Sequence, residues 1–95
     1  MDWTWDRRKA ATNLSKHKVS FELAAMVFDD PNHLSRVDDY PLEERWQTIG
    51  RPLAESALLL LVVHTDASEG GLGGRIISAR KATARERKAY EEGSF

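Results

Sequence analysis

The sequence of 95 residues contains no cysteine, only three prolines and no long hydrophobic run. Without cysteine, a disulfide framework and a thiolate metal site are both excluded. The longest apolar stretch, residues 57–63, is too short to cross a bilayer and is typical of a buried strand. Segment 1–6 contains charged residues and lacks the apolar core of a signal peptide, so we expect a cytoplasmic protein with no membrane attachment.

The composition is that of an ordinary globular domain, with 41% hydrophobic and 31% charged residues. A chain of this length has too little apolar surface for two cores, so we expect a single domain over residues 1–95. His33 and His64 have no potential metal-ligating partners at suitable spacing, and the carboxylates form no recognisable metal-binding motif. We therefore expect neither a metal ion nor another cofactor.

The net charge of -1 conceals a strong segregation of charge along the chain. Residues 1–18 hold five bases and two acids, residues 22–56 hold eight acids and three bases, and residues 75–90 hold six bases and one acid. If the two basic ends meet in space, they form a cationic surface suited to a polyanion. Alternatively, each cluster is simply the solvated face of a helix.

Local patterns predict a short strand and two helices in the N-terminal third. Tryptophans alternate with a polar residue over 3–5, as in a strand, and Asp6 is a favoured N-cap for a helix over 7–17. Ser20 can cap a second helix that extends to about Phe28. Helical spacing places four polar side chains on one face of the first helix: Lys9, Asn13, Lys16 and His17.

The remainder of the chain has the pattern of a sheet followed by a helix. Alternating or continuously apolar segments predict four strands, over residues 34–39, 44–49, 58–64 and 75–80. A glycine-rich connection lies between the last two. Thr83 and Glu86 form a capping box for a final helix over 84–92, which Gly93 ends. The predicted class is α+β: a largely antiparallel sheet with two N-terminal helices and one C-terminal helix packed on it.

Several short stretches carry a further signal through their order and spacing. They are Trp5-Asp6 with Lys9, Asn13 and Lys16-His17; residues 19–22 with Ala25 and residues 27–31; Arg45 with Ile49-Gly50; and residues 75–80 with Ala82, Glu86-Arg87 and Tyr90. Together they resemble the BrnT family of bacterial and archaeal toxins, over Trp5 to Tyr90. The sequence departs from the family pattern at Lys18, where the family usually has glycine, and in a longer, more glycine-rich loop over 67–74.

The resemblance implies a RelE-like fold and a ribonuclease toxin of a type II toxin–antitoxin system, which inhibits translation by cleaving RNA. It also implies a BrnA-like antitoxin as the partner, in a complex of two toxins and two antitoxins. In such a complex the antitoxin binds operator DNA, so the toxin would contact DNA only indirectly.

Metal-independent RNA cleavage through the 2′-hydroxyl requires a base, cations for the phosphate and a proton for the leaving 5′-oxygen. For this reaction, His17 is the candidate general base or acid. Arg80 can bind phosphate with its planar guanidinium. Tyr90 can donate a proton or stack on a nucleobase. The candidate RNA-binding residues are Lys9, Lys16, Arg45, Arg75, Arg85 and Arg87. Arg45 could join Arg80 if their strands are neighbours. The mechanism depends on the first and last helices covering the same side of the sheet.

Each candidate catalytic residue also has a structural alternative. His17 can interact favourably with the negative end of its helix, Arg80 can form an ion pair with Glu86, and Tyr90 can belong to the core. The basic residues over 85–88 can face solvent or the antitoxin instead of RNA. The competing function is a non-enzymatic, toxin-like module that acts only by binding its partner. Ribosome dependence and RNA sequence preference stay open.

Overall fold

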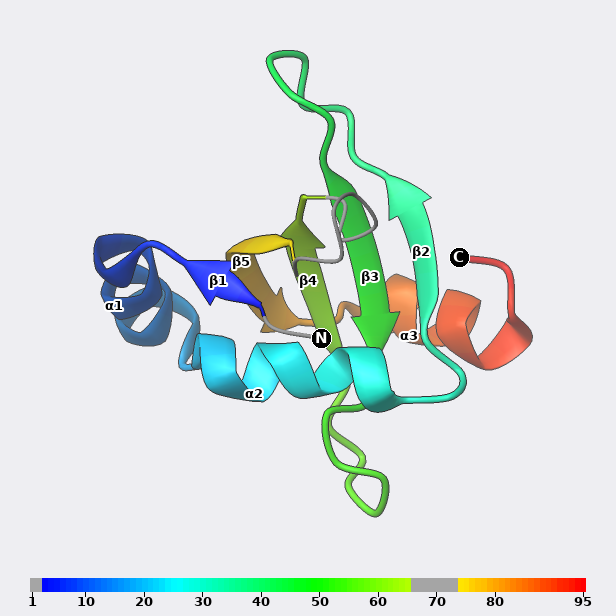
Figure 1. Ribbon diagram of the computed structural model, residues 1–95. Coiled ribbons are helices and arrows are strands. Elements are labelled where there is room, and N and C mark those ends of the chain that lie inside the picture. Colours follow the sequence, from blue (N-terminus) through cyan, green and yellow to red (C-terminus); the bar gives the residue numbers. More distant parts are fainter. Residues whose placement is uncertain (1–2, 66–73) are drawn as a thin grey trace.

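The computed structural model describes residues 3–65 and 74–95, so most of the glycine-rich connection predicted over 65–74 lies outside the described residues. The elements follow the predicted order (Figure 1). They are β1 (Thr4–Trp5), α1 (Arg7–His17), α2 (Phe21–Ala25), the 3₁₀ turn η1 (Met26–Asp29), β2 (Leu34–Val37), β3 (Trp46–Gly50), β4 (Leu60–His64), β5 (Arg75–Lys81) and α3 (Ala84–Glu92).

The five strands form one sheet in the order β1-β5-β4-β3-β2. In the described part of the chain, only β1 is parallel to its neighbour, β5, and the other three pairings are antiparallel. This confirms the predicted α+β class with a largely antiparallel sheet and three α-helices. In the described part of the chain, no helix combines the length and apolar character that spanning a membrane requires.

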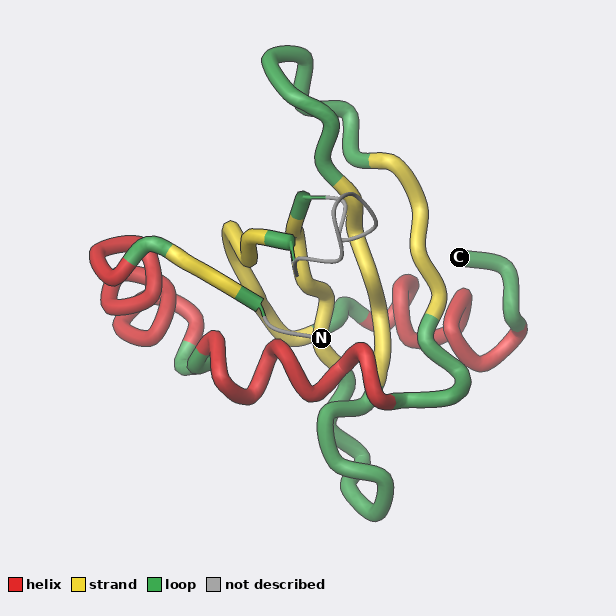
Figure 2. The backbone as a smooth tube through the Cα atoms, in the orientation of Figure 1, coloured by secondary structure: helices red, strands yellow, loops and turns green. Residues whose placement is uncertain are grey.

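Local capping signals fix the helix ends as predicted. The Asp6 carboxylate accepts hydrogen bonds from two backbone amides at the start of α1, and Ser20 accepts one at the start of α2. Thr83 and Glu86 form the reciprocal capping box of α3, and Gly93 ends that helix with a left-handed φ of 69°. The second predicted helix changes type at Met26, where α2 gives way to the 3₁₀ turn η1. Figure 2 draws the two as one continuous helical segment.

The helices are divided between the two faces of the sheet. On β4, Leu60 and Val62 pack in a cluster with α2 residues such as Phe21, whereas Leu61 packs in a second cluster with Tyr90 of α3. Successive side chains of a strand point to opposite faces. Accordingly, α2 lies in front of the sheet and α3 behind it in Figure 1. Helix α1 packs against β5 and adds Ala10 to the cluster on the α2 side. The expectation that the first and last helices cover the same side is therefore wrong, because the central strand is apolar on both faces and different helices pack on each.

One buried side chain, Asn13, attaches α1 to the sheet. Its Nδ2 group donates to the backbone oxygens of Val19 and Ala79, both at 2.9 Å, and its Oδ1 atom accepts from the Ala79 backbone amide at 3.0 Å. Strand β1 pairs only with the first two residues of β5. Beyond that short pairing, the Asn13 carboxamide satisfies the edge of β5 as a further strand would.

We expect Asn13→Ala to lower the free energy of unfolding by about 3 kcal/mol, because three buried backbone groups lose their partner. Chemical denaturation measures this loss. Thr12→Ala is the matched control, since Thr12 is exposed on the same helix, and it should change stability by less than about 0.5 kcal/mol. An Asn13→Ala protein as stable as the control would show that the side chain is not a structural anchor.

Lys18, the residue that departs from the family pattern, has a left-handed backbone with φ 61°. Glycine adopts this conformation without the steric cost of a Cβ atom. The Lys18 Nζ atom donates to the Ser15 oxygen at 2.9 Å, an exposed bond that offsets little of that cost. We expect Lys18→Gly to raise the free energy of unfolding by about 1 kcal/mol. Thermal unfolding measures the change, and a lower melting temperature would contradict this account.

Candidate nucleic-acid interface

Two rows of side chains cross the face of the sheet on which α3 packs. The first row follows the strand register through Leu34, Ile49, Leu61 and Arg80. The second runs parallel to it through Arg36, Gln47, Val63 and Ser78. Tyr90 of α3 packs on the apolar part of the first row, whereas every member of the second row is at least partly exposed. Half of this face therefore carries polar side chains that solvent can reach.

Arg45 and Arg75 share one carboxylate beyond the second row. The Glu43 Oε1 atom lies 3.0 Å from Arg45 Nε and 2.7 Å from Arg75 Nη2. The guanidinium of Arg45 also stacks over the Tyr40 ring, 3.7 Å from its centroid. Hydrogen bonding from Arg45, together with the charges of both arginines, holds the pKa of Glu43 below its usual value. The connection 38–45 thus brings together two cations that are 30 positions apart in the sequence.

Arg80 forms a two-pronged ion pair with Glu86, with N–O distances of 2.8 and 2.9 Å. The hydrogen bonds from Arg80 lower the pKa of Glu86 to about 2, and the same contact raises the pKa of Arg80. Of the two side chains, Arg80 is 38% exposed and Glu86 13%. The ion-pair alternative for Arg80 is therefore present in the free protein, although part of its guanidinium still faces solvent.

Arg36 completes a group of four arginines on this face. Its Nε atom donates to Gln47 Oε1 at 2.8 Å, and its guanidinium lies over the Phe95 ring at 4.1 Å. Gln47 in turn donates to Asp38 Oδ1 at 2.6 Å. These contacts fix the orientation of the Arg36 guanidinium, although Arg36 as a whole is exposed to solvent.

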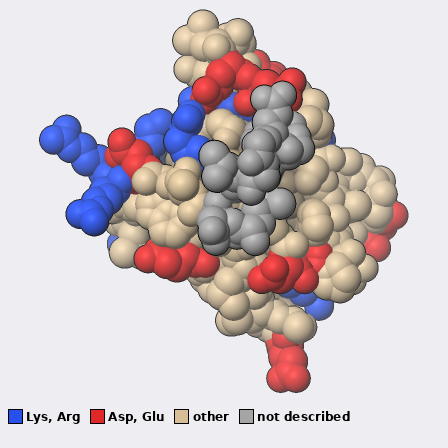
Figure 3. Space-filling model, viewed as in Figure 1, with Lys and Arg blue, Asp and Glu red and all other residues tan. Residues whose placement is uncertain are grey.

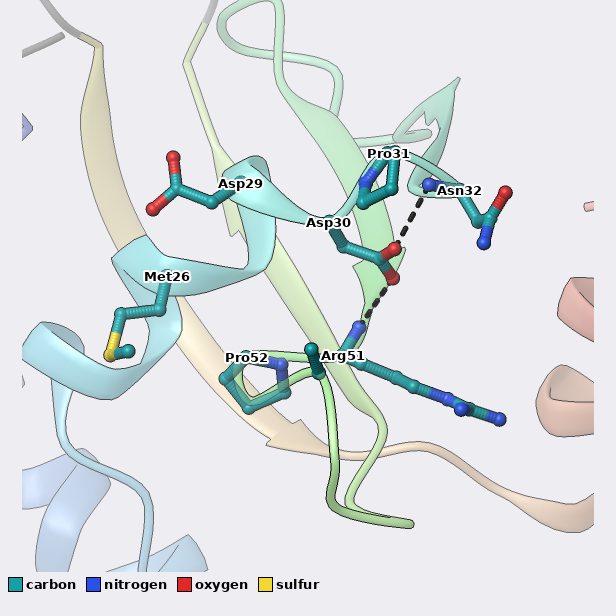
Figure 4. Close-up of a pocket in the computed structure, with 8 residues that line it drawn as sticks. Met26, Asp29, Asp30, Pro31, Asn32, Arg51 and Pro52 are labelled. Atoms are coloured by element: carbon teal, nitrogen blue, oxygen red, sulfur yellow. Dashed lines mark hydrogen bonds between the residues drawn. The ribbon is translucent and has the colours of Figure 1, made fainter.

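The Tyr90 hydroxyl forms a hydrogen bond near the C-terminal end of α3. Its hydroxyl donates to Asp30 Oδ2 at 2.6 Å, and the same oxygen accepts from the Arg51 backbone amide at 2.8 Å. Burial and the bond to Asp30 raise the pKa of Tyr90 to about 12. Burial alone would raise the pKa of Asp30. Hydrogen bonds from Tyr90 and from backbone amides outweigh the effect of burial, so the pKa of Asp30 is lowered. Beside Asp30 lies a hollow of about 330 Å³, and Arg51 extends away from the carboxylate there (Figure 4).

The predicted site residues of α1 lie elsewhere. Helix α1 packs against β5 through Asn13 and adds Ala10 to the core on the α2 face. Lys9 and Lys16 are exposed, and His17 is half-buried at the end of the helix, one turn beyond Asn13. On the face seen in Figure 3, lysines and arginines gather towards α1 and acidic residues follow α2. The face in view therefore shows no continuous positive groove.

Four of the nine predicted site residues thus lie on the α3 face. Arg45 and Arg75 meet at Glu43, whereas Arg80 contacts Glu86 and Tyr90 contacts Asp30. Arg85 is exposed on α3, and Arg87 donates to the Ala57 oxygen at 2.9 Å. The condition under which Arg45 could join Arg80, that their strands are neighbours, is not met, because β4 lies between β3 and β5. Among the described residues, no group of three or more histidine, aspartate or glutamate side chains is arranged to hold a metal ion.

Sequence reasoning missed Arg36 and Glu43 as members of this surface. Alternation alone could have found Arg36, because it lies two positions from Leu34 on a predicted strand and so shares its face. Glu43 had no comparable signal, since its position depends on how the connection 38–45 folds back.

The family described as "Ribonuclease toxin, BrnT, of type II toxin-antitoxin system" matches residues 5–86 of this chain. The chain belongs to the BrnT family. A type II system pairs each toxin with an antitoxin, so membership of the family implies an antitoxin partner.

The fold of this BrnT-family chain is similar to that of a solved relative. The crystal structure of the Brucella abortus ribonuclease toxin, BrnT, superposes with a TM-score of 0.60 at 22% sequence identity. The alignment covers 87% of this chain and 97% of the Brucella chain. Comparison with curated protein sequences gives no match.

The Arg80–Glu86 pair predicts a specific acid sensitivity of this BrnT-family protein. Because the folded-state pKa of Glu86 is lowered to about 2 from 4.5, the pair stabilises the fold above pH 4.5 and loses this effect as the pH falls towards 2. We expect the wild type to lose about 1–2 kcal/mol more unfolding free energy over this interval than Glu86→Gln, after allowing for solvent screening at Arg80.

Urea unfolding of both proteins between pH 2 and pH 6 measures that difference. Glutamine preserves an acceptor for the Thr83 amide, so the capping box is retained. Glu92→Gln is the control, because the Glu92 carboxylate forms only a long, exposed ion pair with Lys88, at 3.9 Å, among the residues that the structure describes. Identical pH slopes for the wild type and Glu86→Gln would show that the pair contributes nothing.

Proposed function

We propose that this protein is a RelE-like endoribonuclease that cleaves RNA in the cytoplasm by metal-independent attack of the 2′-hydroxyl, and so inhibits translation. The observation that supports this proposal is the group of four arginines on the half-open α3 face: Arg36, Arg45, Arg75 and Arg80. Phosphodiesters are bound by such cations, and a planar guanidinium can donate two parallel hydrogen bonds to a phosphate.

Arg80 is the proposed phosphate-binding residue at the reacting centre. Its guanidinium already forms two parallel bonds with a carboxylate, a geometry that a phosphate can reproduce. An arginine in this role stabilises the charge that develops on the phosphate oxygens in the transition state. Arg45 and Arg75 are proposed to bind the scissile phosphate together with Arg80, with Lys9, Lys16, Arg85 and Arg87 as outer contacts.

The proton-transfer roles of His17 and Tyr90 stay predictions. Tyr90 lies on the correct face, but it can donate a proton to a leaving 5′-oxygen only after its hydroxyl leaves Asp30. His17 ends a helix that packs on β5 and the α2 face, so RNA would have to reach round the β5 edge of the sheet to contact both His17 and Arg80.

The proposed partner is a BrnA-like antitoxin in a complex of two toxins and two antitoxins. Family membership supports an antitoxin partner. The antitoxin is proposed to inhibit the toxin by covering the RNA-binding face. DNA contact is proposed to occur only through the antitoxin. The mass of the purified complex, measured by light scattering, tests the stoichiometry.

We expect Arg80→Ala to reduce RNA cleavage by at least about 100-fold in the presence of EDTA, because the transition-state phosphate loses its main cation. The assay uses antitoxin-free protein and follows cleavage of RNA alone and on translating ribosomes. Lys88→Ala is the matched control, since it removes an exposed positive charge from the same part of the molecule.

Antitoxin binding by each variant is measured alongside cleavage. Retained binding with lost cleavage supports an enzyme whose active face includes Arg80. A wild-type protein that binds antitoxin but leaves RNA intact under both conditions would contradict the proposal and favour the non-enzymatic module. In the same assay, His17→Ala tests the α1 prediction separately.

A further inference from the structure

The arginine-rich face needs a group that can remove a proton from a 2′-hydroxyl, and carboxylates are the acid–base groups beside the four arginines. Within residues 3–65 and 74–95, Glu43 and Glu86 bond to these arginines, and Asp38 bonds to Gln47, the partner of Arg36. Glu86 is unsuitable, because both of its oxygens bond to Arg80 and its side chain is only 13% exposed. Both oxygens of Asp38 also accept hydrogen bonds, from Gln47 and from the Tyr40 amide.

Glu43 differs from these two carboxylates in its free oxygen. Arg45 and Arg75 both bond to Oε1, and within the described residues Oε2 receives no hydrogen bond. The side chain is 37% exposed. One oxygen is therefore held between two cations, while the other has no hydrogen-bond partner within the described residues and belongs to a partly exposed side chain.

The surroundings of Glu43 hold it in place. Arg45 is only 16% exposed, stacks on Tyr40, and its backbone oxygen accepts from the Asp38 amide at 2.8 Å. Arg75 begins β5, and its backbone amide donates to Thr65 Oγ1 at 2.8 Å. The carboxylate is thus oriented by two arginines anchored on different elements, which is the preorganisation that a reacting group requires.

We propose that Glu43 is the general base of the ribonuclease reaction, and that Arg45 and Arg75 bind the scissile phosphate beside it; this inference rests on the proposed function. The Oε2 atom takes the proton of the 2′-hydroxyl, and the 2′-oxygen forms a bond to the adjacent phosphorus. The bond from phosphorus to the 5′-oxygen breaks, and that oxygen takes a proton from water. The products are a 2′,3′-cyclic phosphate and a 5′-hydroxyl, and Glu43 then returns its proton to solvent.

Substrate binding makes Glu43 a better base than it is in the free protein. Both arginines now lower the pKa of Glu43 through hydrogen bonds and charge. An RNA phosphate that binds these arginines competes with the carboxylate and adds a negative charge beside it. Both effects raise the pKa of Glu43 and so strengthen it as a base when the substrate is in place.

The test compares Glu43→Gln with Glu44→Gln, which removes the neighbouring exposed carboxylate. The substrate is a mixed-sequence RNA oligonucleotide, supplied at saturation in EDTA, alone and with translating ribosomes. Affinity is measured with the same oligonucleotide carrying 2′-deoxy sugars, which lacks the nucleophile. Thermal unfolding of each variant checks that the fold is retained.

We expect Glu43→Gln to reduce the single-turnover cleavage rate at least 100-fold, while the affinity for the 2′-deoxy oligonucleotide is unchanged or higher. The wild-type rate should rise with pH through an acidic limb that Glu43→Gln lacks, and Glu43→Asp should recover part of the rate. Glu44→Gln should stay within about twofold of the wild type.

The inference is overturned if Glu43→Gln cleaves within threefold of the wild type, or if its loss of rate is matched by an equal loss of affinity. In either case the proposed function still stands where the wild type cleaves RNA and Arg80→Ala does not. A wild-type protein that cleaves RNA under neither condition overturns both.

Discussion

The architecture depends on the hydrogen bonds between the Asn13 carboxamide and the backbone of Ala79. An antiparallel sheet must satisfy the outer edge of its last strand, and here a two-residue strand covers only the start of that edge. Further along that edge, the Asn13 side chain bonds to the backbone of Ala79. It also bonds to the backbone oxygen of Val19, at the turn into α2. The same residue therefore closes the sheet edge and directs α2 onto one face. The opposite face is left to α3, which is too short to cover all of it.

This incomplete cover sets the character of the α3 face. Where α3 packs, the sheet presents Ile49 and Leu61; beyond the helix it presents arginine, glutamine and serine. Arg45, Arg75 and Arg80 are paired with carboxylates, but exposed ion pairs contribute at most about 1 kcal/mol each. A polyanion can displace such partners at little cost while it finds the guanidinium groups already oriented. The ion pairs thus preserve binding geometry without blocking it.

The sequence predicted what depends on neighbours along the chain. The side chains of Asp6, Ser20 and Thr83 cap helices through amides two or three positions away, so those boundaries agree with the structure. Which helix covers which face was not predictable in the same way. Strand β4 is apolar on both faces, so its sequence indicates that other elements pack on each face of the sheet. It does not indicate which of α1, α2 and α3 packs on which face. The meeting of Arg45 and Arg75 at Glu43 also depends on long-range folding, because 32 positions separate Glu43 from Arg75.

The division of the two faces also decides where proton transfer can occur. His64 lies on the α2 face, buried, with Nε2 2.7 Å from Thr48 Oγ1 and Nδ1 2.8 Å from the Thr65 oxygen. His33 contacts the Asp30 backbone oxygen through Nδ1 at 2.7 Å. These two histidines are therefore engaged in structural contacts away from the arginine group. The carboxylate of Glu43 lies beside the arginines that are proposed to bind phosphate, so a phosphate that engages those arginines would increase its basicity. On this face, the proposed substrate-binding cations and the strength of the proposed base are therefore coupled through the same two guanidinium groups.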